Sequence, residues 1–336
     1  MDFSKTALYD SLISRSKAEV DDIRRLLNCN VKSSLNKADM TLQVTEYLLN
    51  NPGDWLIRFP MNDLSVVKGL VSIKPGARYN AGLRPYPTVL ELMELIESET
   101  DKNGNTIMWT SAEMHRCLKS GIDSAVAYCH SHDYPVYETY VSGMLTIYGI
   151  VRMEDMIDML YSVEKMLDEQ RETVHGLACN ALGYIRDSLL LQYYAMEIDN
   201  LRFYTHPALE YPEKIYFERN SRKDAVRAGK KFPLEEIRKA GAPGPFITAG
   251  AGSSYGQALM RELEGLGLTG DAAKMAYHTC FMTAQDNPAG LIKYLSKIGA
   301  GKLSSMEHVG RIMNVLMAFS NNMPRWILDG YSSSEV

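Results

Sequence analysis

Cationic side chains gather with aromatic rings between residues 211 and 239. From 212 to 240, nine Lys or Arg stand against five Asp or Glu, a net charge of +4 in a chain whose overall charge is −5. Cations can follow a phosphodiester backbone while rings stack on bases, so this composition favours nucleic-acid contact. The rings are Tyr211, Tyr216 and Phe217, and the candidate phosphate ligands are Arg219, Arg222, Lys223, Arg227, Lys230 and Lys231. The alternative is a solvated helix face, on which pairs such as Glu218 and Arg222 neutralise each other.

A second set of candidate phosphate ligands lies within the first fifty residues. These are Lys17, Arg24, Arg25, Lys32 and Lys37. Ser16 with Glu19, and Asn36 with Asp39, have the spacing of helix N-caps with an acidic first turn. The sequence therefore predicts two short helices joined by the polar, strand-leaning segment NCNVKSSL. Cations beside a helix N-terminus can bind phosphate, whereas the interspersed carboxylates allow a merely solvated face.

Other residues that could carry chemistry lack the spacing that the chemistry needs. Cys129, His130, His132 and Asp133 are too close together in one loop to complete a zinc site without a distant pair. His278 and Cys280 are two residues apart on a predicted helix, which favours a core cysteine over a nucleophile with its base. The glycine-rich segment 244–256 has Tyr255 where a dinucleotide fingerprint needs glycine. We therefore expect no catalytic residue, no metal and no cofactor, and hence a protein that is not an enzyme.

Composition sets further bounds. The hydrophobic content of 46% and the charged content of 23% are ordinary for a folded globular chain. The overall charge of −5 argues against a protein that coats long stretches of phosphate backbone. The five cysteines form no CxxC pair, which favours reduced thiols and a cytoplasmic location. The sequence shows neither a secretory leader nor an apolar stretch long enough to span a membrane.

Helical periodicity dominates the chain, so we predict a mainly α fold. Helices are expected at 61–71 and at about 87–96, and the proline- and glycine-rich segment 74–87 is expected to be irregular. Asn103-Gly104 predicts a strand, turn and strand over 94–110. The bundle-like pattern of 254–320 predicts packed helices with short connections.

The middle of the chain has the order of a winged helix-turn-helix. A helix at 136–149, a short link, helices over 152–167 and 173–188, and a hairpin over 188–206 follow one another. The third helix would read bases with Arg171, His175, Asn180 and Arg186. Many acidic residues precede it, so the alternative is a protein-interaction module.

These patterns suggest four parts. They are a helix-extended-helix module at 1–52, a winged-helix-like region with two small hairpins at 53–210, a basic segment and linker at 211–253, and a helical bundle with a C-terminal tail at 254–336. In the tail, Trp326 is expected to pack the end of the chain back onto the bundle.

Three segments resemble a known group. The opening two helices are similar to modules of the SAP and Rho N-terminal type. Together with YGIVRMEDMIDML at 148–160, the tail resembles that of bacterial Rho N-terminal-like proteins that often carry a SEC-C zinc motif. The matching tail residues are Asn321, Asn322, Pro324, Trp326, Gly330, Tyr331, Ser332 and Glu335. Since no cysteine-rich extension follows in this sequence, we expect the zinc motif to be absent.

The resemblance and the clustered cations together predict a non-enzymatic, cytoplasmic protein that associates with DNA or RNA and has a regulatory role. The alternative is a protein–protein interaction adaptor, favoured by the acidic total charge and the methionine-rich helices.

Overall fold

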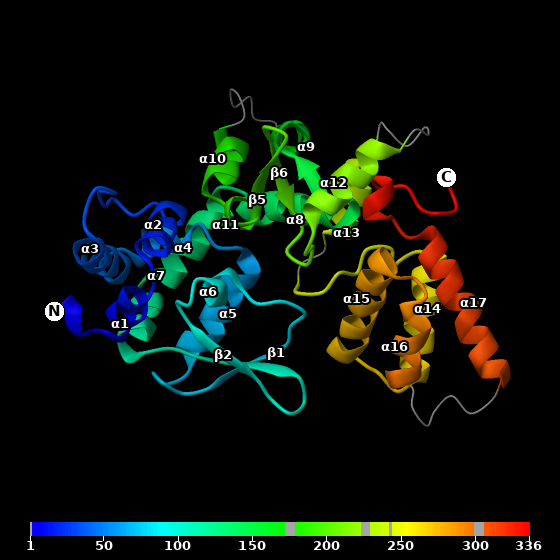
Figure 1. The fold of residues 1–336 in the computed structure, drawn as a ribbon, viewed down its shortest axis with the longest axis horizontal. Coiled ribbons are helices and arrows are strands. Elements are labelled where there is room, and N and C mark those ends of the chain that lie inside the picture. The colour runs from blue at the N-terminus through cyan, green and yellow to red at the C-terminus, as the bar shows by residue number, and fades with distance from the viewer. Residues whose placement is uncertain (1, 172–178, 223–228, 242–243, 299–305) are drawn as a thin grey trace. The chain divides into compact units, whose positions relative to one another are not determined.

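The chain folds mainly into helices, with two small three-stranded antiparallel sheets (Figure 1). The structure is a computed structural model that describes residues 2–171, 179–222, 229–241, 244–298 and 306–336. Its contacts divide the chain into two compact units, and each is described by itself. Unit 1 is Met1–Tyr137 with His175–Tyr194, and unit 2 is Glu138–Val174 with Ala195–Val336. The boundaries predicted at 52, 210 and 253 stay predictions.

Unit 1 contains most of the short helices and the first sheet. Its elements are η1 (Phe3–Lys5), α1 (Ala7–Ser14), α2 (Lys17–Leu26), α3 (Lys37–Asn50), α4 (Pro52–Leu56), α5 (Met61–Ser72), β1 (Tyr79–Leu83), α6 (Val89–Leu92), β2 (Glu97–Thr100), β3 (Asn105–Trp109), α7 (Ala112–Ser131), α10 (Cys179–Asp187) and α11 (Leu189–Tyr193). Helix α8 (Tyr134–Tyr148) begins in unit 1 and continues into unit 2.

The two predicted N-terminal helices are confirmed, and so are their caps. At the start of α2, the Ser16 hydroxyl accepts from the Glu19 amide while the Glu19 carboxylate accepts from the Ser16 amide. At the start of α3, Asn36 accepts from the Asp39 amide. Each cap satisfies backbone donors that the first turn leaves open. Turns and coil form the link between the helices.

The first sheet has the strand order β1-β3-β2. Strands β2 and β3 form the predicted hairpin, with Glu97 opposite Trp109. The prediction that 74–87 is irregular is wrong, because β1 adds to the outer edge of β3 with a bulge between Asn80 and Leu83. The prolines of this segment flank β1 instead of interrupting it, and an edge strand tolerates such neighbours. The helix predicted at 87–96 is reduced to the single turn α6.

The core of unit 1 forms where α4 packs against α7. Trp55 is fully buried, and its indole nitrogen donates to the Leu48 carbonyl at 2.9 Å. On α7, Gly121 is required because a Cβ there would lie 2.7 Å from the Pro52 Cβ. The Arg58 guanidinium lies 3.4 Å from the Asp187 carboxylate, and both side chains are buried. This ion pair joins α10 to the segment that follows α4.

Unit 2 contains the second sheet and the C-terminal helices. Besides the greater part of α8, its elements are β4 (Ile150–Arg152), α9 (Met153–Arg171), β5 (Ala195–Ile198), β6 (Leu201–Thr205), α12 (Pro212–Ser221), α13 (Leu234–Ala240), α14 (Ser254–Gly265), α15 (Asp271–Asp286), α16 (Gly290–Ile298), α17 (Met306–Asn322) and η3 (Trp326–Leu328).

The second sheet has the order β4-β6-β5. Strands β5 and β6 confirm a hairpin within the predicted 188–206, with Ala195 opposite Tyr204. The first half of the predicted first strand is wrong, because Leu189–Tyr193 forms the short helix α11. Strand β4 was missed because three residues are too few to show a period. It pairs with β6 through Ile150 opposite Thr205. The fold thus has a third strand beside each predicted hairpin.

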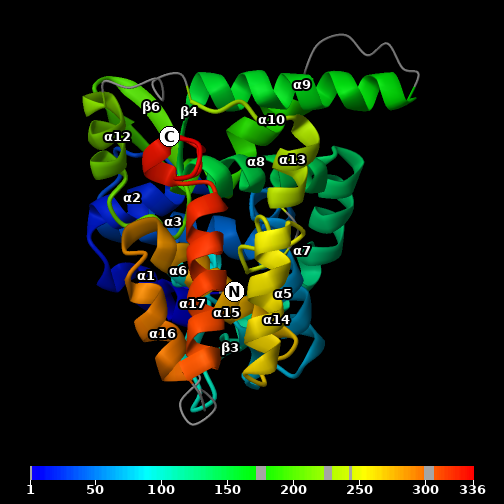
Figure 2. The same ribbon diagram turned by 90° about the vertical axis from the view of Figure 1, so that its right-hand side faces the viewer.

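Helices α14 to α17 share one hydrophobic core, and Figures 1 and 2 show them side by side. Trp326 belongs to this core and is 2% exposed, which confirms its predicted role in packing the tail. Its indole nitrogen donates to the Thr146 carbonyl at 2.8 Å, and its amide donates to the Gln285 side chain. Gly149 has a φ of 72°, and a Cβ there would lie 2.6 Å from the Trp326 ring. The tail therefore closes against the end of α8.

Two buried histidines lie near this tryptophan. The Nδ1 atom of His206 accepts from the Ala208 amide, and that of His278 accepts from the Ile247 amide. Burial lowers the pKa of His206 to about 3, with a further contribution from neighbouring His278. Burial likewise lowers the pKa of His278 to about 4. Both rings are therefore neutral in the folded protein, and protonation at Nδ1 would break a backbone hydrogen bond.

We predict that acid destabilises unit 2 through these two rings. An unfolded histidine titrates near its ordinary pKa of 6.5, so below that pH the unfolded chain binds more protons than the folded one. The free energy of unfolding should then fall with falling pH by up to about 1.4 kcal/mol per pH unit for each histidine. Urea unfolding at about pH 7 and about pH 5 measures this change.

His278→Gln should show a smaller loss of stability between the two pH values than the parent protein. His130→Gln is the matched control, because His130 is exposed on α7 and should leave the pH dependence unchanged. An equal pH dependence in the parent and in His278→Gln would contradict the assignment.

Candidate functional site

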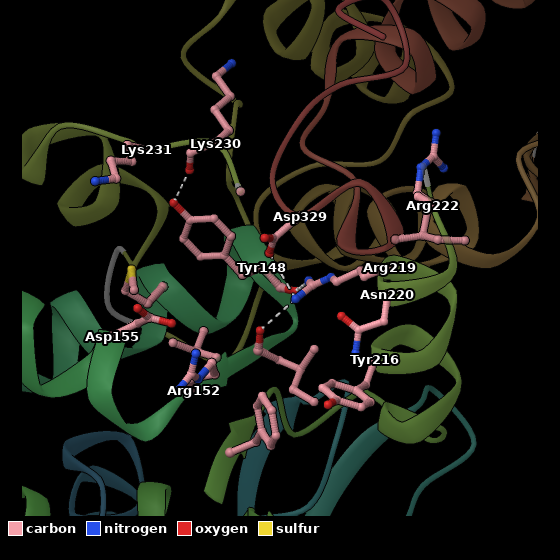
Figure 3. A pocket seen from close by; sticks show the side chains of 16 residues that line it. Tyr148, Arg152, Asp155, Tyr216, Arg219, Asn220, Arg222, Lys230, Lys231 and Asp329 are labelled. Atoms are coloured by element: carbon pink, nitrogen blue, oxygen red, sulfur yellow. Dashed lines mark hydrogen bonds and ion pairs between the residues drawn. The ribbon is translucent and has the colours of Figure 1, made fainter. Parts of the chain in front are cut away.

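Helix α12 presents three polar residues along one face. Tyr216, Arg219 and Asn220 are three and four positions apart, so they lie above one another on the helix. All three line a cavity of about 630 Å³ within unit 2 (Figure 3). The opposite wall comes from the end of α8, from β4 and from Asp155 at the start of α9. Phe203 of β6, residues 229–231, Ile327 and Asp329 complete the lining.

Arg219 is the most constrained side chain of the cavity. Its guanidinium donates to the carbonyls of Trp326 at 2.8 Å, Ile150 at 3.2 Å and Tyr148. It also pairs with the Asp329 carboxylate at 2.9 Å. Burial lowers the pKa of Arg219, and Asp329 opposes that shift. Since its donors point at protein oxygens, Arg219 braces the walls of the site, and its role as a phosphate ligand stays a prediction.

Lys230 is also held by the C-terminal tail. Its ammonium pairs with the Glu335 carboxylate at 2.5 Å and lies 4.9 Å from the centre of the Phe232 ring. Its amide donates to the Asp329 carbonyl, and its own carbonyl accepts from the Tyr148 hydroxyl. These contacts fix the position of the strip 229–231 beside the cavity.

Arg152 and Asp155 face the cavity from β4 and α9 (Figure 3). Burial raises the pKa of Asp155, and the nearby Arg152 charge opposes the rise. The Arg152 side chain is 48% exposed and lies 3.4 Å from Glu154. Arg152 can therefore turn toward an anion at the mouth of the cavity. Burial also raises the pKa of the Tyr148 hydroxyl, which stays protonated and donates a hydrogen bond.

The structure brings together four of the six cations predicted in the basic segment. Arg219, Arg222, Lys230 and Lys231 all line the cavity, whereas Lys223 and Arg227 lie outside the described residues. Sequence reasoning missed Arg152 and Asn220. Asn220 could have been predicted from its position one helical turn after Tyr216. Arg152 could have been predicted only if strand β4 had been recognised. Five cations and two carboxylates face this cavity among the described residues.

The predicted cations of the first module belong to unit 1 and form a different arrangement. Arg24 pairs with Asp21 at 2.7 Å and also donates to the Val31 carbonyl. Arg25 pairs with both Asp21 and Asp22. The hydrogen bond from Arg24 is the main reason why the pKa of Asp21 is lowered. Lys17 and Lys32 are exposed, and Lys37 is half-buried.

The predicted reading helix is α10. Arg186 points into solvent but forms a two-pronged hydrogen bond with Asp187, and Asn180 is half-buried. His175 and the side chain of Arg171 lie outside the described residues. Because Arg186 already donates to the Asp187 carboxylate, a base would have to compete with that carboxylate for the guanidinium.

The residues weighed as a zinc or thiol site have other contacts. The His132 ring stacks on Tyr128 at 4.0 Å, and its Nδ1 lies 2.9 Å from the Tyr128 carbonyl. Cys280 is fully buried, as predicted for a core residue. Within the described ranges, no three His, Cys, Asp or Glu side chains are gathered so that they could hold a metal ion.

A second hollow, of about 420 Å³, lies within unit 1. Its lining is acidic, with Glu91, Glu94 and Glu97 beside Trp109. Glu91 caps α6 and Glu94 pairs with Arg15 at 2.8 Å, so two of the three carboxylates serve the fold. An acidic lining repels phosphate, so the cavity of unit 2, with five cations in its lining, is the better candidate anion site of these two hollows.

Comparisons with protein-family models, with curated proteins and with solved structures find no match to this chain. In the part of the chain that the structure describes, no helix has both the length and the apolar character needed to cross a bilayer.

We predict that Arg219→Ala destabilises the protein by about 3–5 kcal/mol, because it leaves Asp329 and three carbonyls without their shared partner. Arg219→Lys should lose less, since it keeps the charge but not the planar fork. Chemical unfolding followed by circular dichroism measures both variants.

Arg222→Ala is the control at the end of the same helix and should cost less than about 1 kcal/mol. Equal losses for Arg219→Ala and Arg222→Ala would contradict the bracing role.

Proposed function

We propose that this protein associates with nucleic acid without acting as an enzyme, and that the cavity of unit 2 makes the phosphate contacts. The observation that carries the proposal is the convergence of Arg152, Arg222 and Lys231 on one hollow from β4, the end of α12 and the strip after it. Asp329 pairs with Arg219, Glu335 with Lys230 and Glu154 with Arg152. The five cations of the lining still outnumber its two carboxylates, Asp155 and Asp329, so the hollow carries a net positive lining that suits phosphate.

Connectivity gives independent support to the winged-helix interpretation of the middle region. The chain runs α8, β4, α9, α10, α11, β5 and β6, and the first strand pairs with the last in the order β4-β6-β5, while α10 and α11 belong to unit 1. Unit 1 repeats a shorter version, with α5, β1, α6, β2 and β3 and the order β1-β3-β2. Helix, strand, helix and a closing hairpin occur in many nucleic-acid-binding modules, although connectivity alone argues fold more strongly than function.

The alternative function is that of a protein-interaction adaptor. Tyr211 is 67% exposed and Phe217 is 54% exposed, and both lie on or beside α12. Exposed aromatic residues are common at protein interfaces. The same experiment separates the two functions, because an adaptor surface made of these rings would show little dependence on salt.

We expect labelled single- and double-stranded DNA and RNA to bind the full chain at low salt and to be released as salt is raised. Fluorescence anisotropy measures the affinity. The double variant Arg222→Ala with Lys231→Ala should weaken binding and reduce the slope of log affinity against log salt by about 2.

The matched control is the double variant Arg238→Ala with Lys239→Ala on α13. It removes the same charge, but both cations pair with Glu235 and neither lines the cavity. Absence of binding to every nucleic acid at low salt, or equal weakening by the two double variants, would overturn the proposal.

A further inference from the structure

We propose that the cavity of unit 2 accepts one unstacked nucleotide, with its base against Tyr216 and the phosphates that flank it toward Arg152 on one side and Arg222 on the other. This inference rests on the proposed function and makes it more specific. It predicts that the protein prefers single-stranded nucleic acid to a duplex.

The first argument is the shape of the site. Its volume of about 630 Å³ is in the range of cavities that bury one small ligand. A duplex presents its phosphates on a convex surface with the bases stacked inside, so it can touch the rim of a hollow but cannot fill it. A single strand can turn one base out of its stack and insert it.

The second argument is the rigid aromatic platform at the cavity wall. The Tyr216 hydroxyl donates to the Asp199 carboxylate at 3.0 Å. Its ring meets the Phe203 ring edge to face at 5.3 Å and the Phe217 ring at the same distance. Because three contacts fix the ring, stacking a base on it costs little conformational entropy.

The third argument is the distribution of polar groups around that platform. Asn220 lies beside Tyr216 on α12, where its side chain hydrogen-bonds the Tyr216 hydroxyl, and the remaining groups of its amide can donate to or accept from a base edge (Figure 3). Arg152 lies across the hollow on β4, and Arg222 lies at the end of α12 (Figure 3). Apolar Ile150, Val151 and Met144 also line the hollow. A nucleotide matches this arrangement, because its base is a planar ring with a polar edge and its phosphate is negatively charged.

The decisive variant is Tyr216→Leu, which keeps an apolar side chain but removes the stacking ring. Anisotropy with a labelled single strand should show a loss of affinity of about tenfold, in line with the loss of one base–aromatic stack. Tyr216→Phe keeps the ring and should bind within about twofold of the parent. Tyr211→Leu is the matched control, since it removes an exposed aromatic ring that does not line the cavity. Circular dichroism and thermal melting check that each variant is folded.

Competition identifies what the cavity holds. A nucleoside monophosphate should displace the labelled single strand from the parent protein, and inorganic phosphate at the same concentration should displace much less. Preference for the single strand over the duplex, loss of affinity in Tyr216→Leu and this order of competitors would together support the inference.

Two other results have different meanings. Equal binding of single strand and duplex, with Tyr216→Leu unchanged but the Arg222 and Lys231 double variant weakened, would overturn the nucleotide inference and leave the proposed function standing. Equal displacement by inorganic phosphate would likewise reduce the cavity to a simple anion site. Absence of binding to any nucleic acid would overturn both.

Discussion

The Arg219 guanidinium is the contact on which the architecture of unit 2 depends. It joins the end of α8 and the start of β4 to η3, through the carbonyls of Tyr148, Ile150 and Trp326. Removing a cation from water costs several kcal/mol unless its donors find partners. That condition is met when all three segments and Asp329 are in place, so this one side chain ties the walls of the cavity to one another.

The need to bring these partners close to Arg219 also explains the backbone around its guanidinium. Gly149 takes a φ of 72° between Tyr148 and Ile150, which turns the chain sharply from α8 into β4. Gly229 also has a positive φ, and a Cβ there would lie 2.4 Å from the Asp329 carboxylate. Glycine is the residue that adopts such conformations at low cost and allows such close approach. The tail can therefore reach Arg219 because two glycines make room for it.

The sequence predicted local features well. Both N-terminal caps and the turns of both hairpins depend on residues close together in the sequence, and the structure confirms them. The burial of Trp326 is confirmed too, although its contacts are distant in sequence. The sequence did not predict strands β1 and β4, because they are short edge strands whose partner strands are distant in sequence. The charge cluster was visible, but the role of each cation was not. Arg219 contacts a carbonyl 107 residues further along the chain, and no local pattern contains that information.

The neutralised cations also bear on how a ligand would be recognised. The whole chain carries a charge of −5, so long-range attraction to a polyanion is weak at a Debye length of about 8 Å. Tail carboxylates already balance Arg219 and Lys230. Under the proposed function, affinity would then come mainly from contacts at short range, where burial in a hollow and stacking on Tyr216 add to a few charge-assisted hydrogen bonds. Such contacts would favour a ligand with a base as well as a phosphate over one that offers charge alone.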